Sequence, residues 1–175
     1  AGLGENNIKQ YLGRYGIHVP ISTVSHHSSH AAAGYFTSPF TEASIVVIDS
    51  IGEFESLSIW DAIGTKVKKT FKQSYPDSLG LWYSALTQRV GLKPNEDEYI
   101  LMGMAAYGDP LRLFNDILND FIYIPDIDNS PRIKFKHNLH RGCKWWRPDL
   151  TTKQDMFDIA AATQAVYEYI LKIIN

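Results

Sequence analysis

The sequence predicts a mixed α/β fold in which a three-stranded antiparallel meander is followed by helices. Residues 43–49 (ASIVVID) form a nearly continuous apolar run, which is typical of a strand covered on both faces, so we expect a central strand there. Two segments with alternating apolar and polar residues, 55–60 and 66–71, follow after short turns and complete the meander. A strongly amphipathic segment over 78–90 then predicts the first helix behind the sheet.

The segments before the meander predict two helices and an extended connection. Residues 5–15 have weak helical spacing, and 17–24 is short, β-branched and interrupted by a proline, as in an edge strand or an extended entry. Ser25 can cap an alanine-rich helix that begins at His26 and ends before the Ser-Pro pair at 38–39.

After the meander the pattern is mainly helical. Small and capping residues separate the periodic segments. We expect a helix from about 78 to 90, a short buried helix over 99–107, a helix over 111–121, a hairpin that pairs 123–124 with 132–135, and a long helix from Lys153 onward.

The composition describes one ordinary domain and excludes several classes of protein. The chain has 175 residues, 45% of them hydrophobic, with a net charge of −2, so it has no basic field for nucleic acid or an anionic membrane. Its apolar runs are far shorter than the ~20 residues of a membrane span. Its one cysteine, Cys143, leaves no intrachain disulfide, and we expect a cytoplasmic protein.

The last predicted helix carries no stop signal, because it ends on Ile-Ile-Asn. We therefore expect the chain to be a piece of a larger protein. An apolar face on this helix would then lack a cover and favour self-association or contact with a longer polypeptide. That face comprises Val166, Ile170, Leu171 and Ile174.

The densest chemical feature is the run His26-His27-Ser28-Ser29-His30. On a helix, His26 and His30 are four residues apart and share one face, the spacing that lets two histidines hold one metal ion. Asp49 ends the buried strand and would complete a set of two histidines and one carboxylate, which suits Fe(II). The alternative is that both histidines cap the helix or bond to the backbone. His27 is expected to pack or to support the site.

The turn after the first strand is a second candidate site. Ser50, Gly52 and Glu53 follow Asp49, and small residues after a strand let backbone N–H groups approach a phosphate. The alternative is a β-hairpin that binds no ligand.

Four blocks of the sequence resemble the NodU/CmcH-type O-carbamoyltransferases. They are similar, in order, to family segments that read roughly HHxxHAAxAYxxSPF…DGxGE, FPxSLGxxYSAxT, GEYKxMGLAPYGxP and DIAAxxQ. The blocks are HHSSHAAAGYFTSPFTEASIVVIDSIGE, YPDSLGLWYSALTQRVGL, EYILMGMAAYGDP and DIAAATQAVYEYI. Together they lie within residues 24–172, so the resemblance covers nearly the whole chain.

The resemblance implies that residues 1–175 are a fragment of a Kae1-like nucleotide- and metal-binding domain. Its fold would be part of a ribonuclease-H-like lobe, as in actin, Hsp70 and sugar kinases. The YrdC-like carboxy-terminal domain, which makes carbamoyl adenylate from carbamoyl phosphate and ATP, would not be present. By position, the resemblance implies that His26, His30 and Asp49 hold Fe(II) or another divalent metal.

The same resemblance places the nucleotide at the turn of Ser50, Gly52 and Glu53. Two departures from the family pattern bear on nucleotide contacts. Ser50 replaces the usual glycine, which makes the turn stiffer, and Ile100 replaces a common lysine, which removes one cation that could meet a phosphate.

The implied function is ATP-dependent transfer of a carbamoyl group from carbamoyl adenylate to a hydroxyl of a small-molecule acceptor. His26 or Asp49 would take the acceptor proton. The expected partners are the acceptor, the missing parts of the polypeptide and a second copy of the chain, but neither nucleic acid nor membrane, and the fragment alone is expected to be inactive. Two rival hypotheses are a non-catalytic actin-like nucleotide-binding module and a histidine-based metal-dependent hydrolase.

Overall fold

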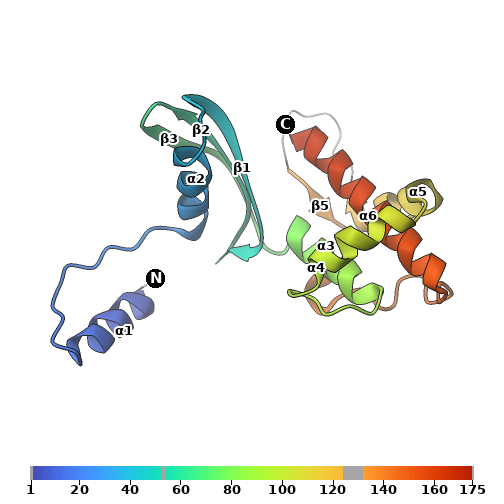
Figure 1. Ribbon diagram of the computed structural model, residues 1–175, viewed down its shortest axis with the longest axis horizontal. Coiled ribbons are helices and arrows are strands. Elements are labelled where there is room, and N and C mark those ends of the chain that lie inside the picture. The colour runs from blue at the N-terminus through green and yellow to red at the C-terminus, as the bar shows by residue number, and fades with distance from the viewer. Residues whose placement is uncertain (1, 53, 124–131, 175) are drawn as a thin grey trace.

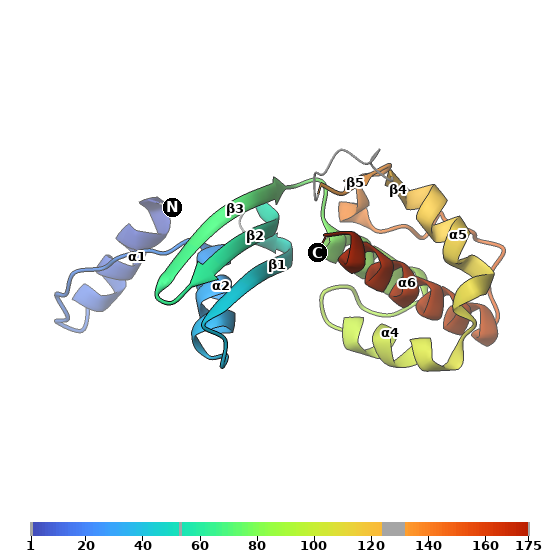
Figure 2. The same cartoon turned by 90° about the horizontal axis from the view of Figure 1, so that it is seen from above.

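The computed structural model describes residues 2–52, 54–123 and 132–174, and these form a sheet part and a helical part that lie side by side (Figures 1 and 2). The first helix, α1 (Gly2–Gly13), lies apart from both parts in Figure 1. Residues 17–25, which have no regular secondary structure, connect it to the sheet part, so the region predicted as an extended entry is one.

The sheet part confirms the predicted meander. Strands β1 (Glu42–Gly52), β2 (Glu55–Ile63) and β3 (Lys66–Ser74) pair antiparallel in the order β1-β2-β3, and each is longer than predicted. Gly64 forms the turn between β2 and β3 with a φ of 59°, a conformation that glycine adopts without strain. Helix α2 (His26–Phe36) covers one face of the sheet, as Figure 2 shows.

The prediction that residues 43–49 form the central strand is wrong, because β1 is at the edge of this sheet and β2 is central. The apolar run reflects cover from two sides. Val47 and Ile45 pack in a small core beneath α2, whereas Val46 and Ile48 pack against the main core of the helical part. Sequence periodicity reports that both faces are covered, but it does not report which element covers them.

The helical part encloses the main core. Its core side chains include the fully buried Trp82, Leu86, Leu101, Phe121 and Ile159. Its elements are α3 (Leu79–Arg89), α4 (Glu98–Met104), the 3₁₀ helix η1 (Ala105–Tyr107), α5 (Pro110–Phe121), β4 (Ile122–Tyr123) paired with β5 (Lys134–Phe135), the 3₁₀ helix η2 (Leu139–Arg141) and α6 (Lys153–Ile174).

Two predictions about burial in this part are wrong. The helix predicted over 99–107 is mostly exposed, and in α4 only Leu101 is buried. Conversely, the expected bare face of α6 is covered: Val166, Ile170 and Ile174 are 0%, 3% and 8% exposed, because α6 packs along α5 and against α3 and α4. These three side chains are therefore not available as a bare surface for self-association.

None of the described helices is both long and apolar enough to span a membrane.

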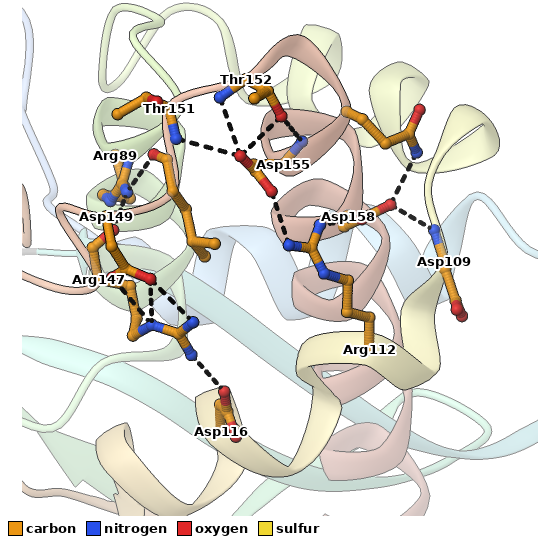
Figure 3. A network of polar contacts seen from close by, with 12 residues as sticks. Arg89, Asp109, Arg112, Asp116, Arg147, Asp149, Thr151, Thr152, Asp155 and Asp158 are labelled. Carbon is orange, nitrogen blue, oxygen red and sulfur yellow. Dashed lines mark hydrogen bonds and ion pairs between the residues drawn. The ribbon is translucent and has the colours of Figure 1, made fainter.

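A buried carboxylate ties the N-terminal part of α6 to the start of α5 (Figure 3). Asp158 of α6 is 3% exposed and accepts hydrogen bonds from the Asp109 N–H (2.8 Å), the Arg112 guanidinium (2.5 Å) and the Gln154 amide (2.9 Å). Burial raises the pKa of Asp158, but the hydrogen bonds from Asp109, Arg112 and Gln154 outweigh it and leave that pKa below its usual value.

Candidate functional site

The two histidines of the predicted pair lie on one face of α2. Ser25 caps this helix, its hydroxyl oxygen accepting from the Ser28 N–H, so the helix begins at His26 as predicted. The Nε2 atoms of His26 and His30 are 3.1 Å apart, and their rings meet edge to face with centroids separated by 4.5 Å. The prediction that His26 and His30 share one face of this helix is confirmed.

The third residue, Asp49, reaches this pair from β1. Its Oδ2 lies 2.5 Å from Nε2 of His26 and 4.0 Å from Nε2 of His30. Its Oδ1 accepts the backbone N–H of Ser50 at 2.7 Å, which fixes the carboxylate. The structure thus brings together the three residues that the sequence predicted as a metal-binding set. The side chains of His26, His30 and Asp49 are 43%, 56% and 29% exposed, respectively.

The donor set fits a single cation. A carboxylate only accepts, so His26 must donate from Nε2 to Asp49, and that nitrogen then has no lone pair left for His30. A proton on His26 therefore satisfies the contact with Asp49 but not the contact with His30. A cation would bind Nε2 of both histidines and Oδ2 of Asp49 at once. Given the three distances between these atoms, one position lies about 2.0 Å from all of them, which is the usual length of a metal–nitrogen or metal–oxygen bond.

His27 lies beside the pair, its ring centroid 6.1 Å from that of His26, and it anchors α2 to the sheet. It is 1% exposed, and its Nδ1 lies 2.7 Å from the Ser58 hydroxyl of β2, which also accepts from Nε1 of Trp60. Burial lowers the pKa of His27, opposed by the charge of Glu55. Nε2 of His27 is buried without a hydrogen-bond partner among the described residues. The predicted packing role is confirmed, and it sets the rotation of α2 that turns His26 and His30 toward Asp49.

Asp49 also lies at the edge of a pocket of about 450 Å³. The pocket is walled by the end of β1 and by α3, α4 and α6. Sequence reasoning found Asp49 but none of the helical residues. Its polar and aromatic lining includes Asp49, Tyr83, Glu98, Tyr99, Gln164 and Tyr167.

The predicted phosphate-binding turn lies only partly within the described residues. Ser50 and Gly52 belong to β1, and Glu53 falls outside the described residues. The backbone of Ser50 is already used, since its N–H donates to Asp49 and its carbonyl oxygen accepts from the Ser78 hydroxyl at 2.6 Å. Nucleotide binding by this turn stays a prediction.

Helix α3 begins directly against this part of β1. A Cβ at Gly80 would lie 2.7 Å from the Ser50 nitrogen and 2.9 Å from the Asp49 carbonyl carbon, which are backbone atoms that cannot rotate away. The absence of a side chain at Gly80 therefore allows α3 to pack close to the strand that carries Asp49.

Replacing Gly80 with alanine should push α3 away from β1 and destabilise the fold by about 1–3 kcal/mol. The matched control is Gly34→Ala, at an exposed position in α2 where an added Cβ meets nothing within 4 Å. This control should raise stability by about 0.5–1 kcal/mol, as alanine does in a helix. Urea unfolding of both variants checks the pair, and equal effects would contradict the close packing of α3.

A histidine pair on a helix and a carboxylate on a strand that also lines a pocket define an α/β domain with an enzyme-like polar site. The family is shown by comparison with known sequences. The family described as Carbamoyltransferase N-terminus matches residues 9–171, and the chain belongs to it.

Its relatives include proteins of bacterial nodulation. The chain is 35% identical over 156 residues to Nodulation protein NolNO of Sinorhizobium fredii, covering 86% of this chain and 22% of that protein. It is 32% identical over 166 residues to Uncharacterized protein sll1178 of Synechocystis, covering 87% and 27%. It is 28% identical to Nodulation protein NolO of Bradyrhizobium diazoefficiens, covering 85% and 27%. The chain spans about a quarter of the length of these relatives.

Proposed function

We propose that this chain supplies the metal-binding part of an ATP-dependent O-carbamoyltransferase, which moves a carbamoyl group from carbamoyl adenylate to a hydroxyl of a small-molecule acceptor. The donor would be made from carbamoyl phosphate and ATP. The observation that carries the proposal is the convergence of His26, His30 and Asp49 beside a pocket, in a chain that belongs to a carbamoyltransferase family.

In this proposal His26, His30 and Asp49 hold one divalent cation, with Fe(II) as the first candidate. Bound there, the cation would supply Lewis acidity that polarises the carbamoyl carbonyl or orients the acceptor hydroxyl. A set of two histidines and one carboxylate leaves coordination positions open for substrate, which a structural metal site does not.

The residues of the chain would orient the acceptor and remove the proton from its hydroxyl group. Asp49 is the site carboxylate that borders the pocket, so a hydroxyl held there can pass its proton to Asp49. The Ser50 N–H keeps Asp49 in place during this transfer. The carbamoyl carbon gains a bond to the acceptor oxygen, and AMP leaves with the electrons of its former acyl bond.

We further propose that the sheet and helices form part of a ribonuclease-H-like lobe, and that Ser50, Gly52 and Glu53 approach the phosphates of the nucleotide. Since the chain spans about a quarter of its relatives, formation of the adenylate is assigned to parts of those proteins outside the matched region. The 175-residue chain alone is therefore expected to transfer no carbamoyl group.

The metal assignment is tested by anaerobic calorimetric titration of the chain with Fe(II), with Co(II) as a stable substitute. The chain should bind one equivalent, and His30→Ala should weaken binding by at least about tenfold because one of three ligands is lost. His18→Ala is the control, because His18 is exposed, lies in the segment between α1 and α2, and is not in the cluster.

Lowering the pH should weaken the wild-type affinity, because a protonated histidine cannot ligate a metal and protons therefore compete with the cation. Equal affinity of the His30→Ala variant and the wild type, or no binding by the folded chain, would contradict the metal site and would favour a non-catalytic nucleotide-binding module.

A further inference from the structure

The pocket beside Asp49 has the size of a small-molecule site and borders the cluster of His26, His30 and Asp49. It is formed where the end of β1 meets three helices, and its volume of about 450 Å³ suits a ligand of one or two rings. Because Asp49 borders it, a ligand in the pocket would present its nearest group to the cluster of His26, His30 and Asp49.

The charge of the lining is one-sided. The described residues that line the pocket include two carboxylates, Asp49 and Glu98, and no lysine, arginine or histidine. In the metal-free chain a nucleotide phosphate would be repelled here, since nothing in this lining offsets its charge, and phosphates that approach Ser50 would need the divalent cation proposed at Asp49. A protonated amine meets the opposite situation, because a carboxylate attracts it. Both oxygens of Asp49 already accept hydrogen bonds, from His26 and Ser50, which leaves Glu98 as the carboxylate open to the amine.

Hydrogen bonds fix the carboxylate of Glu98 in a position from which it can bind such a ligand. Its Oε1 accepts from the Ser84 hydroxyl (2.5 Å) and from the Asn95 N–H (2.7 Å), which fixes the side chain. The described residues give Oε2 of Glu98 no hydrogen-bond partner. One oxygen of Glu98 therefore positions the carboxylate, and the other is available to a ligand.

Tyrosines form the rest of the wall. Tyr83 and Tyr167 stack edge to face with centroids 5.6 Å apart, and the Tyr83 hydroxyl donates to Oε1 of Gln164 at 2.9 Å. Burial, with Tyr167 and Glu98 nearby, raises the pKa of Tyr83 to about 12, so its hydroxyl stays neutral. Aromatic faces attract cations and also stack on the apolar faces of sugar-like rings.

We infer that this pocket binds the acceptor through a protonated amine, with Glu98 as the residue that selects for it and Tyr83 and Tyr167 as its aromatic wall. The ligand class is a small hydroxylated ring that carries at least one ammonium group. The identification of this ligand as the acceptor rests on the proposed function. The preference of the pocket for a protonated amine does not depend on that function.

The test compares glucosamine with glucose, which carries a hydroxyl in place of the amine, by ligand-observed NMR on the metal-free chain. Glucosamine should bind about tenfold more tightly, as expected for a hydrogen bond to a charged group. Glu98→Gln keeps the shape and Oε1, and it should abolish the preference without weakening glucose. Glu96→Gln is the control, since Glu96 is exposed, pairs with Lys93 and does not line the pocket.

Equal binding of both sugars, a preference that survives in Glu98→Gln, or no binding of either sugar by the folded chain would overturn the inference. Displacement of glucosamine by AMP would do so as well, because it would assign the pocket to the nucleotide. His30→Ala should lose metal affinity and keep the amine preference. Failure of the amine preference alone therefore contradicts the pocket, and failure of metal binding alone contradicts the proposed function.

Discussion

Replacing Asp49 with asparagine is expected to lower the rate of carbamoyl transfer by more than about a hundredfold. The substitution keeps the shape of the side chain but removes the charge that His26 and His30 face at 2.5 Å and 4.0 Å. An amide oxygen is a weaker ligand than a carboxylate and a poor acceptor for the proton of a hydroxyl. Binding of the metal and removal of the acceptor proton should therefore fail together.

The assay for Asp49→Asn needs a polypeptide that joins this chain to the parts its relatives have outside the matched region, supplied with ATP and radiolabelled carbamoyl phosphate. A panel of free sugars and amino sugars serves as acceptors, and the label in the sugar product is counted. Asp61→Asn is the control, because Asp61 is an exposed carboxylate of β2 that does not line the pocket. Transfer by Asp49→Asn at the wild-type rate would remove Asp49 from the mechanism.

Replacing Asp158 with alanine is expected to destabilise the fold by about 3 kcal/mol, a large part of the stability of a domain of this size. The variant leaves the N–H of Asp109 without its partner and deprives Arg112 of one of its two carboxylates, the other being Asp155 (Figure 3). Asp149→Ala is the matched control, since Asp149 is an exposed carboxylate whose partner, Arg147, also pairs with Asp116. It should change the free energy of unfolding little.

The lowered pKa of Asp158 predicts that the stability of the fold depends on pH. Because the folded state lowers the pKa of Asp158, its contribution to stability is present above the usual carboxyl pKa near 4 and is lost as the pH falls through the folded value. Urea unfolding between neutral and acid pH should show wild-type stability falling from about pH 4 downward, with a smaller fall in Asp158→Ala. Parallel pH profiles would contradict the role of Asp158 in the network.

The residues of the candidate metal set could be predicted because their signal is local. The spacing of His26 and His30 needs only a helix, and the cap at Ser25 fixes where that helix begins. Asp49 was found because a carboxylate at the end of an apolar run is costly unless it has a partner. Each inference used fewer than ten neighbouring residues.

The order of the sheet and the pocket could not be predicted, because both depend on long-range packing. Nothing in residues 43–49 distinguishes an edge strand covered by two different elements from a central strand. The pocket joins Tyr83, Glu98 and Gln164 from three helices, and periodicity does not encode how helices meet. Glu98 is the first residue of the block EYILMGMAAYGDP, and that block was the one signal available for it.

The most direct measurement is X-ray absorption at the iron edge, on the chain loaded with one equivalent of Fe(II) under anaerobic conditions. We expect two imidazole nitrogens and one carboxylate oxygen at bonding distance, with one imidazole lost in His30→Ala and none lost in His18→Ala. Iron bound without imidazole, or an identical spectrum in His30→Ala, would contradict the claim that His26, His30 and Asp49 hold the metal together.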